Sequence, residues 1–312
     1  MASKLGVNLQ EKVIAIYGAS SNIGRKFTQE AARRGATIVA VARNIDKVLS
    51  YLKQADTRNI EVIQGDITQL EDVRKALHGR DVDATINFAA NFSPDALRSR
   101  SVNVIGEQHV LDASKEFGIK RHIYISTIAT QAQKPNAYSN TKREAENVVK
   151  AAGGKQLDWI ILRYANVLGT QTWNQPFKFI FPYLRLAIPK VPTDAKDAIF
   201  PYVTIETAIE ATLSALEARP NQTITILDGE TTIEEYLSAM EKVYNVRRSY
   251  LPSKQLQSLN KHFGKYFPSI AGLCAALEFL THPPTFENTT MKRELKVKTR
   301  TFQEWMAFKN IS

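Results

Sequence analysis

Short, nearly continuous apolar runs alternate with amphipathic segments through the first half of the chain. Six runs have the pattern of strands buried on both faces: residues 12–18, 37–43, 60–66, 84–90, 121–127 and 158–164. Between the first two lies a predicted helix, in which Ile23, Phe27 and Ala31 recur at spacings of four and Gly35 marks the end. This strand–helix–strand series predicts an α/β protein with a Rossmann-type, doubly wound parallel sheet.

The pattern changes near Thr170. Residues 172–192 are rich in proline and aromatic residues and predict irregular structure. A helix (204–218), a strand (222–229) and a second helix (233–245) are predicted to follow, and Thr231 and Glu234 form the expected capping box of the second helix. We therefore expect a Rossmann domain over 1–170 and a smaller α/β lobe over 171–312, packed on that domain, with some elements returning to it.

Composition and charge narrow the possible partners. The net charge of +10 suits an anionic cofactor, a membrane surface or nucleic acid, although a solvated basic surface explains it equally. No nucleic-acid-binding motif is present, so we expect no nucleic-acid partner. The single cysteine, Cys274, suits a reducing compartment, and the five histidines lack paired ligand spacing, which predicts no metal site. Without a signal-like or membrane-spanning run, we expect a cytoplasmic protein, with peripheral membrane attachment as an alternative.

A glycine turn follows the first predicted strand. Gly18 can supply a tight turn and Gly24 a close helix–sheet contact, so that the helix N-terminus faces a pyrophosphate. Ser21 stands where a middle glycine is usual and offers a small hydroxyl donor. The alternative is an ordinary strand–helix turn. The residues expected to contact a dinucleotide here are Gly18, Ser20, Ser21, Asn22, Ile23, Gly24 and Arg25.

Cations surround the end of the second predicted strand. Arg43 ends the strand, Lys47 lies nearby, and Arg25 directly follows the glycine turn. A guanidinium pairs well with a ribose 2′-phosphate, so NADP(H) is the favoured cofactor. In the alternative, NAD(H) binds, Asp46 faces the ribose and the cations are solvated.

The third and fourth predicted strands end in further candidate contacts. Asp66 can bond an adenine amine, and Ile67 follows it. Phe88, Ala89 and Ala90 close the fourth strand, where small residues allow the backbone to approach a cofactor. Asp66 can equally cap the next helix, and the alanines can simply pack.

The fifth predicted strand leads into a candidate catalytic set. Ser126 and Thr127 end the strand, and Tyr138 and Lys142 then lie one helical turn apart. Tyr138 is the expected general acid/base, and Lys142 is expected to lower the pKa of Tyr138 and to bind ribose. A hydroxyl of Ser126 or Thr127 would bond the substrate carbonyl.

Together these motifs resemble the extended and atypical branches of the short-chain dehydrogenase/reductase (SDR) superfamily. The resemblance rests on residues 18–24, Asp66, 86–90, Asn103, 126–127, Tyr138, Lys142 and 162–169. It implies a catalytic role for Asn103, and it places Tyr164 where the family usually has a proline, near the nicotinamide. The family's sugar-nucleotide enzymes carry a V-Y-G that this chain lacks, which disfavours such substrates.

A narrower resemblance links the chain to the NADPH-binding accessory subunit of respiratory complex I and its free-standing bacterial relatives. It rests on residues 113–126, 200–216 and 283–297. It implies tight NADPH binding without turnover, a respiratory-complex partner and, in a eukaryote, a place in the mitochondrial matrix.

Two segments of the second lobe combine aromatic and basic residues, 175–190 and 261–280. The favoured explanation is ordinary core packing of the small lobe, and the alternatives are that they accept an apolar substrate or touch a membrane surface; Cys274 is expected to pack. The leading hypothesis is an NADP(H)-dependent oxidoreductase of atypical SDR type, a monomer or homodimer, that acts on a carbonyl or alcohol of an apolar substrate. The alternatives are a non-catalytic NADPH-binding subunit and an NAD(P)-dependent epimerase or dehydratase.

Overall fold

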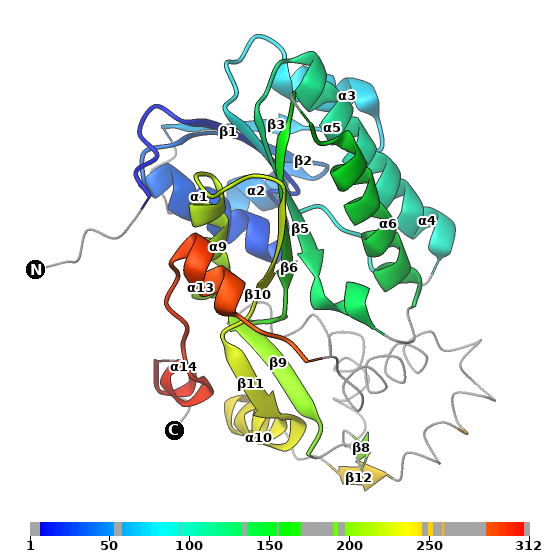
Figure 1. The fold of residues 1–312 in the computed structure, drawn as a ribbon, viewed down its shortest axis with the longest axis vertical. Coiled ribbons are helices and arrows are strands. Elements are labelled where there is room, and N and C mark those ends of the chain that lie inside the picture. The colour runs from blue at the N-terminus through cyan, green and yellow to red at the C-terminus, as the bar shows by residue number, and fades with distance from the viewer. Residues whose placement is uncertain are drawn as a thin grey trace, which may run out of the picture.

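The computed structural model describes residues 7–52, 58–93, 95–132, 136–154, 156–169, 190–192, 197–244, 249–251, 258 and 285–308. A seven-stranded sheet in the order β10-β6-β5-β4-β1-β2-β3 forms its centre, and every neighbouring pair is parallel (Figure 1). Its strands are β1 (Val13–Tyr17), β2 (Thr37–Ala42), β3 (Ile60–Gln64), β4 (Ala84–Asn87), β5 (Arg121–Thr127), β6 (Asp158–Tyr164) and β10 (Gln222–Ile226). The predicted Rossmann-type α/β fold is confirmed.

Helices cover both faces of this sheet (Figure 1). One face carries α1 (Asn22–Arg33), α2 (Ile45–Leu52), α9 (Ile205–Ala215) and α13 (Thr289–Leu295). The other carries α3 (Leu70–Leu77), α5 (Gly106–Glu116) and α6 (Ala137–Ala152), with the short α4 (Ala96–Arg100), the π-helical turn η1 (Ser101–Ile105) and the 3-10 turn η2 (Ile128–Gln131) nearby. The side chains of β1 alternate between the two cores, Ile14 and Ile16 on one face and Ala15 and Tyr17 on the other. This alternation explains why the strand is apolar throughout.

A smaller sheet extends from the end of β6. Its order is β11-β9-β7, formed by β7 (Asn166–Leu168), β9 (Ile199–Thr204) and β11 (Gly229–Thr232). Two helices pack on it, α10 (Ile233–Tyr244) and α14 (Phe302–Phe308), through a cluster that includes Phe200, Tyr236 and Trp305. A parallel pair, β8 (Lys190–Pro192) and β12 (Ser249–Leu251), completes the described strands. Between β9 and β11 the chain returns to the main sheet through α9 and β10.

The capping box of α10 lies one residue later than the sequence predicts. Thr232 Oγ1 accepts from the Glu235 N–H at 3.1 Å, and the Glu235 carboxylate accepts from the Thr232 N–H at 3.2 Å. The prediction that Thr231 and Glu234 form the capping box is therefore wrong. Thr231 pairs with Phe200 in the small sheet, which makes Thr232 the last residue before the helix.

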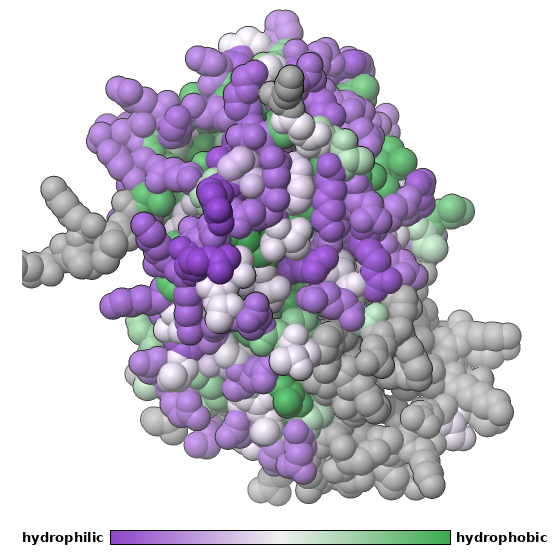
Figure 2. Space-filling model, viewed as in Figure 1, coloured by the Kyte–Doolittle hydropathy of each residue, from purple (hydrophilic) through white to green (hydrophobic). Residues whose placement is uncertain are grey.

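The surface seen in Figure 2 is mainly hydrophilic, with hydrophobic residues scattered in small groups. Among the described residues, no helix is long and apolar enough to cross a membrane. Within the same part of the chain, no group of three or more metal-binding side chains comes together. The aromatic and basic segments, residues 175–190 and 261–280 with Cys274, lie outside the described residues except for Lys190, which begins β8.

Candidate nucleotide and active site

The turn after β1 meets the loop after β4 where the strand order of the main sheet reverses. Such a switch point, at the carboxyl ends of parallel strands, is where ligands bind in this kind of sheet. Gly18 has φ +78°, and a Cβ on it would lie 2.4 Å from the Ala89 backbone nitrogen. Only glycine therefore fits, and the two loops are in backbone contact.

Ser21 is the N-cap of α1. Its Oγ accepts from the Gly24 N–H at 3.0 Å, and its backbone φ of −71° is one that any residue adopts. A Cβ on Gly24 would lie 2.4 Å from the Gly18 carbonyl oxygen, so this second glycine is required by close approach. The turn keeps its geometry without a middle glycine, and the Ser21 hydroxyl proton can still be donated to another group. Ser20, Asn22 and Ile23 are half-buried around it.

Arg25 provides a test of whether the turn fits an anionic cofactor. Its Nε is buried and has no hydrogen-bond partner among the described residues. It lies near Tyr51, whose hydroxyl donates to the Ala19 carbonyl at 3.0 Å. Burial raises the pKa of Tyr51 to about 12, and the Arg25 charge opposes that rise. A buried donor without an acceptor is unfavourable, and a phosphate oxygen would satisfy it. The turn therefore fits a dinucleotide.

Of the cations predicted for a 2′-phosphate, Arg25 lies in α1, Arg43 directly follows β2 and Lys47 lies in the first turn of α2. Arg43 follows β2 with 64% of its side chain exposed, and its Nη1 lies 4.0 Å from Asp66 Oδ2. Lys47 and Asp46 are both exposed in the first turn of α2. Asp66 Oδ1 accepts from the N–H and the hydroxyl of Thr68, both at 2.9 Å, so this carboxylate holds the turn after β3.

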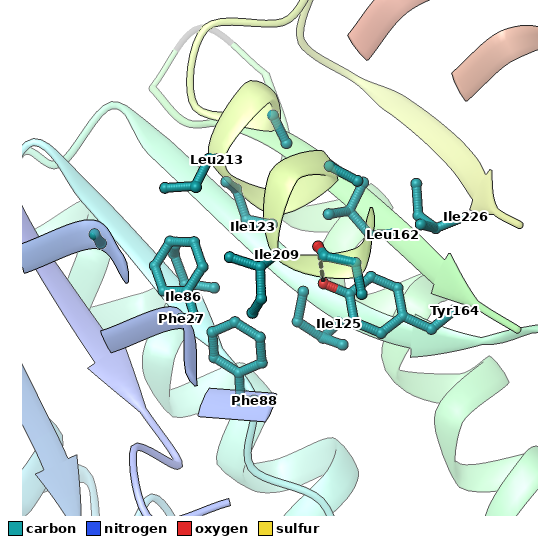
Figure 3. Close-up of a cluster of buried hydrophobic side chains, with 14 of the residues drawn as sticks. Phe27, Ile86, Phe88, Ile123, Ile125, Leu162, Tyr164, Ile209, Leu213 and Ile226 are labelled. Atoms are coloured by element: carbon teal, nitrogen blue, oxygen red, sulfur yellow. Dashed lines mark hydrogen bonds between the residues drawn. The ribbon is translucent and has the colours of Figure 1, made fainter. Parts of the chain in front are cut away.

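Three predicted cofactor contacts have side chains that serve the core. Ile67 is buried, and the Phe88 ring packs 5.4 Å from the ring of Phe27. The Tyr164 hydroxyl donates to the Ala208 carbonyl at 3.1 Å, and Figure 3 shows Phe88 and Tyr164 pointing into this apolar cluster. Only the main chain of these residues remains for a cofactor. Ala90 is half-buried in the loop after β4.

Lys142 lies buried beside the carboxyl end of β5. Its Nζ donates to the Ile125 carbonyl at 2.6 Å and lies 4.0 Å from the centre of the Tyr124 ring, a cation–π contact. Burial lowers the pKa of Lys142 to about 8, and the negative charges of Glu107 and Glu146 oppose that fall. The side chain therefore remains mostly protonated at neutral pH.

Tyr138 lies in the first turn of α6, one turn before Lys142. Asn136 and Ser139 form a capping box that fixes this end of the helix. Burial raises the pKa of the Tyr138 hydroxyl above its ordinary value, opposite to the lowering expected from Lys142. The Lys142 ammonium is instead bonded to the Ile125 carbonyl. Tyr138 is therefore a protonated donor in this structure.

Ser126 and Thr127 point to opposite faces of β5, as successive strand residues do. Ser126 Oγ is buried and donates to Glu146 Oε1 at 2.7 Å, and Arg163 Nε donates to the same oxygen at 2.8 Å. Thr127 is half-buried, and its Oγ1 accepts from the Ala129 N–H at 3.2 Å. Thr127 thus keeps a proton to donate, whereas the Ser126 proton is used in the core.

Asn103 links α6 to the loop after β4. It lies in the π-turn η1 and is buried. Its Nδ2 donates to the Asn91 carbonyl and to Thr141 Oγ1, both at 2.9 Å, and its Oδ1 accepts from the Asn91 N–H at 2.8 Å. These contacts make Asn103 a positioning residue for both elements.

Phe92, in the loop held by Asn103, was not identified from the sequence. Its ring stacks on Tyr138 with centroids 4.5 Å apart and an interplanar angle of 28°. The available signal in the sequence was its place two residues after the fourth predicted strand.

A buried polar chain, also missed from the sequence, ends at the same loop. His122 Nε2 and Glu107 Oε1 are 2.6 Å apart, and Asn87 Nδ2 donates to Glu107 Oε2 at 2.6 Å. Asn87 Oδ1 in turn accepts from the Ala89 N–H at 2.8 Å. The Ala89 N–H is therefore already bonded within the protein, and this series of buried hydrogen bonds fixes the loop that faces Gly18.

Comparison with known proteins gives the class of this chain. A family described as NAD(P)H-binding matches residues 18–175, and the chain belongs to that family. An uncharacterized oxidoreductase of Staphylococcus epidermidis is 27% identical over 168 residues, 48% of this chain and 73% of that protein. A UDP-N-acetylglucosamine 4,6-dehydratase of Campylobacter jejuni is 28% identical over 53% of this chain, and the match spans only 52% of that enzyme. An 11-beta-hydroxysteroid dehydrogenase-like protein of Arabidopsis thaliana is 36% identical over 27% of this chain and 30% of its own length.

Solved structures match over nearly the whole chain. An epimerase from Methanothermobacter thermautotrophicus has a TM-score of 0.75 and 16% identity, covering 97% of this chain and 95% of its own. A UDP-glucose 4-epimerase from Thermotoga maritima, solved with UDP-glucose, has a TM-score of 0.70 and 18% identity, covering 94% and 95%. MoeE5 with UDP-glucuronic acid and NAD has a TM-score of 0.71 and 17% identity, covering 95% and 96%. The chain therefore shares the fold of these epimerases and of MoeE5.

Proposed function

We propose that the protein is an NADP(H)-dependent oxidoreductase of atypical SDR type that interconverts a carbonyl and an alcohol on an apolar substrate. The main support is the buried ammonium of Lys142 at the carboxyl end of β5, one helical turn from Tyr138 and at the same sheet edge as the Gly18 turn. No described carboxylate is in direct contact with this ammonium, and a buried cation without such a partner is expensive in a purely structural core. It is useful where negative charge develops during a reaction.

In the proposed reaction, Thr127 donates a hydrogen bond to the carbonyl oxygen and Tyr138 donates the proton that this oxygen takes up. For Lys142 to stabilise the phenolate that Tyr138 leaves behind, its ammonium would turn from the Ile125 carbonyl toward Tyr138 during the reaction. NADPH, when bound, would supply the hydride to the carbonyl carbon. The Gly18 turn and Arg25 would hold its pyrophosphate.

The preference for NADP(H) is supported by the exposed cations Arg43, directly after β2, and Lys47, in the first turn of α2. An apolar substrate is supported by Phe92, which is 51% exposed while stacked on Tyr138. We also propose that the protein is cytoplasmic.

Replacing Tyr138 by Phe tests this function. NADPH oxidation with a panel of ketones should fall by about 10²- to 10⁴-fold, because the proton donor is lost, while the NADPH Kd stays within about 2-fold. Tyr202→Phe, which removes a tyrosine hydroxyl bonded to the Arg300 carbonyl in the small sheet, is the matched control. Equal turnover by Tyr138→Phe and the parent protein would refute the proposal.

A second candidate is a non-catalytic NADPH-binding subunit of a membrane-associated respiratory complex. The net charge of +10 and the resemblance over residues 113–126, 200–216 and 283–297 favour it. It predicts co-purification with respiratory subunits, in a eukaryote from the mitochondrial matrix, and NADPH that resists exchange.

A third candidate is an NAD(P)-dependent epimerase or dehydratase. It is favoured by the fold shared with the UDP-sugar epimerases. It predicts product formation without net oxidation of the reduced cofactor.

A further inference from the structure

Three charged side chains are buried against one face of β5, the face that α5 and α6 cover. Alternate residues of a strand point to the same face. Three such residues of β5 each contact one of the charged side chains, and the pairs are His122 with Glu107, Tyr124 with Lys142 and Ser126 with Glu146. Charges in such a place need partners in the protein, because water does not reach them.

The two carboxylates have partners of their own. These are His122 and Asn87 for Glu107, and Ser126, Arg163 and the more distant Lys150 for Glu146. Their negative charges raise the pKa of Lys142, but among the described residues no carboxylate contacts its ammonium. Tyr138, one turn earlier on α6, is protonated and adds no charge. The cation therefore depends on a partner other than a carboxylate.

That partner is the face of the Tyr124 ring. Lys142 Nζ lies 4.0 Å from the ring centre, while its hydrogen bond goes to the Ile125 carbonyl at 2.6 Å. The face of an aromatic ring carries negative charge, and its attraction for a cation is strongest where water is excluded. The Tyr124 hydroxyl is buried and makes no hydrogen bond with a described residue. The ring, and not the hydroxyl, is therefore the part of Tyr124 that serves Lys142.

Resting on the proposed function, we propose that Tyr124 is a positioning residue for Lys142, whose ammonium the face of the tyrosine ring holds in its charged form. Tyr124 acts through Lys142 and touches neither substrate nor cofactor. A cation–π contact has no single acceptor atom and extends to about 6 Å from the ring centre. The contact can therefore persist while the ammonium turns from the Ile125 carbonyl toward Tyr138.

The test measures the pKa of Lys142 by NMR in full-length protein that carries ¹³C at the lysine Cε, with the Lys142→Met spectrum used to assign the signal. Tyr124→Leu should lower this pKa by about 1–1.5 pH units, the change that corresponds to loss of a desolvated cation–π contact. Tyr124→Phe keeps the ring and should restore the pKa of the parent protein.

Pentafluorophenylalanine incorporated at position 124 tests the ring without a loss of packing. It keeps the shape of a phenylalanine ring but removes the negative charge of its face, so the pKa of Lys142 should fall as in Tyr124→Leu. Tyr236→Leu is the matched control, because Tyr236 is a buried tyrosine of the small lobe. It should leave the pKa of Lys142 unchanged.

Acetophenone reduction by the NADPH-loaded proteins connects this pKa to the reaction. Because turnover requires the ammonium, the pH at which kcat has fallen to half should move down in Tyr124→Leu by the same amount as the pKa of Lys142. The NADPH-loaded Tyr124→Phe protein should follow the parent profile.

The two measurements separate this inference from the proposed function. A lowered pKa of Lys142 in a protein that turns over no ketone keeps the inference about the ring and refutes the reductase. Turnover with a pH profile that does not follow the pKa of Lys142 keeps the reductase and overturns the positioning role. An unchanged pKa in both the leucine and the pentafluorophenylalanine proteins, or an equal fall in Tyr124→Phe, also overturns the inference.

Discussion

The contact between Gly18 and the loop after β4 gives the sharpest test of the nucleotide site. In Gly18→Ala, the new Cβ would lie 2.4 Å from Ala89 N and 2.8 Å from Phe88 C, both backbone atoms that cannot rotate away. Gly79 offers a matched control. It has a similar φ of +71° against +78° for Gly18, but a Cβ on it would meet nothing within 4 Å.

The two substitutions share one penalty and differ in another. Left-handed backbone costs an L-residue about 1–2 kcal/mol, and the stiffer unfolded chain offsets about 0.4–1 kcal/mol of that. Gly79→Ala should therefore destabilise the fold by roughly 0–1.5 kcal/mol. Gly18→Ala adds overpacking of about 1–3 kcal/mol, relieved only by moving Ala89 away from the turn. If the bound state needs that close approach, NADPH affinity falls by about 5- to 150-fold.

Urea unfolding and NADPH titration of both variants measure these effects. We expect Gly18→Ala to be the less stable protein and the only one of the two with weakened NADPH binding. Equal unfolding midpoints and equal NADPH Kd values for the two variants would refute the reasoning, because they would mean that the contact with Ala89 constrains neither the fold nor the cofactor.

Three further predictions concern the catalytic set and the cofactor. Thr127→Ala should lower turnover about 10²-fold through loss of a donor to the carbonyl oxygen. Ser126→Ala should mainly lower the free energy of unfolding, by about 1–3 kcal/mol, because the buried Glu146 carboxylate loses a donor. Ketone kinetics and urea unfolding separate the two, and the reverse assignment would contradict the structure. Burial lowers the pKa of Lys142 to about 8, so its ammonium is present below that pH. Ketone turnover should therefore fall as pH rises through about 8 in the parent and show no such transition in Lys142→Met. Arg43→Ala should reduce the preference for NADPH over NADH about 5- to 20-fold, as expected for one exposed charge-assisted bond, and an unchanged ratio of the two Kd values would remove Arg43 from the 2′-phosphate site.

The parallel sheet was predictable because its strands are buried on both faces. The predicted limits of β5 and β6, residues 121–127 and 158–164, agree with the structure. The position of β10 beside β6 was not predictable from the sequence, because it depends on the packing of α9 against α1, two helices far apart in the chain. The α10 capping box failed for a local reason, because the run Thr231-Thr232 followed by two glutamates fits the spacing in two registers.

In the candidate site, too, features set by local spacing were predictable and features set by contacts between distant elements were not. The glycine turn and the Tyr138–Lys142 pair follow from local spacing, so the sequence alone could predict them. The sequence could not choose between Ser126 and Thr127, because the choice depends on which face of β5 is covered by α6. Phe92 and the buried pair Glu107–His122 were missed because their partners come from other elements of the fold.

Transfer of deuterium tests the central claim most directly. NADPH carrying deuterium at the nicotinamide C4 is incubated with the parent and Tyr138→Phe proteins and with acetophenone, and the alcohol product is examined by mass spectrometry. The account predicts a deuterated alcohol from the parent and almost none from Tyr138→Phe, although both bind NADPH. Tight NADPH binding with no deuterium in any product, across the wider ketone panel as well, would contradict it and favour a structural role for the cofactor.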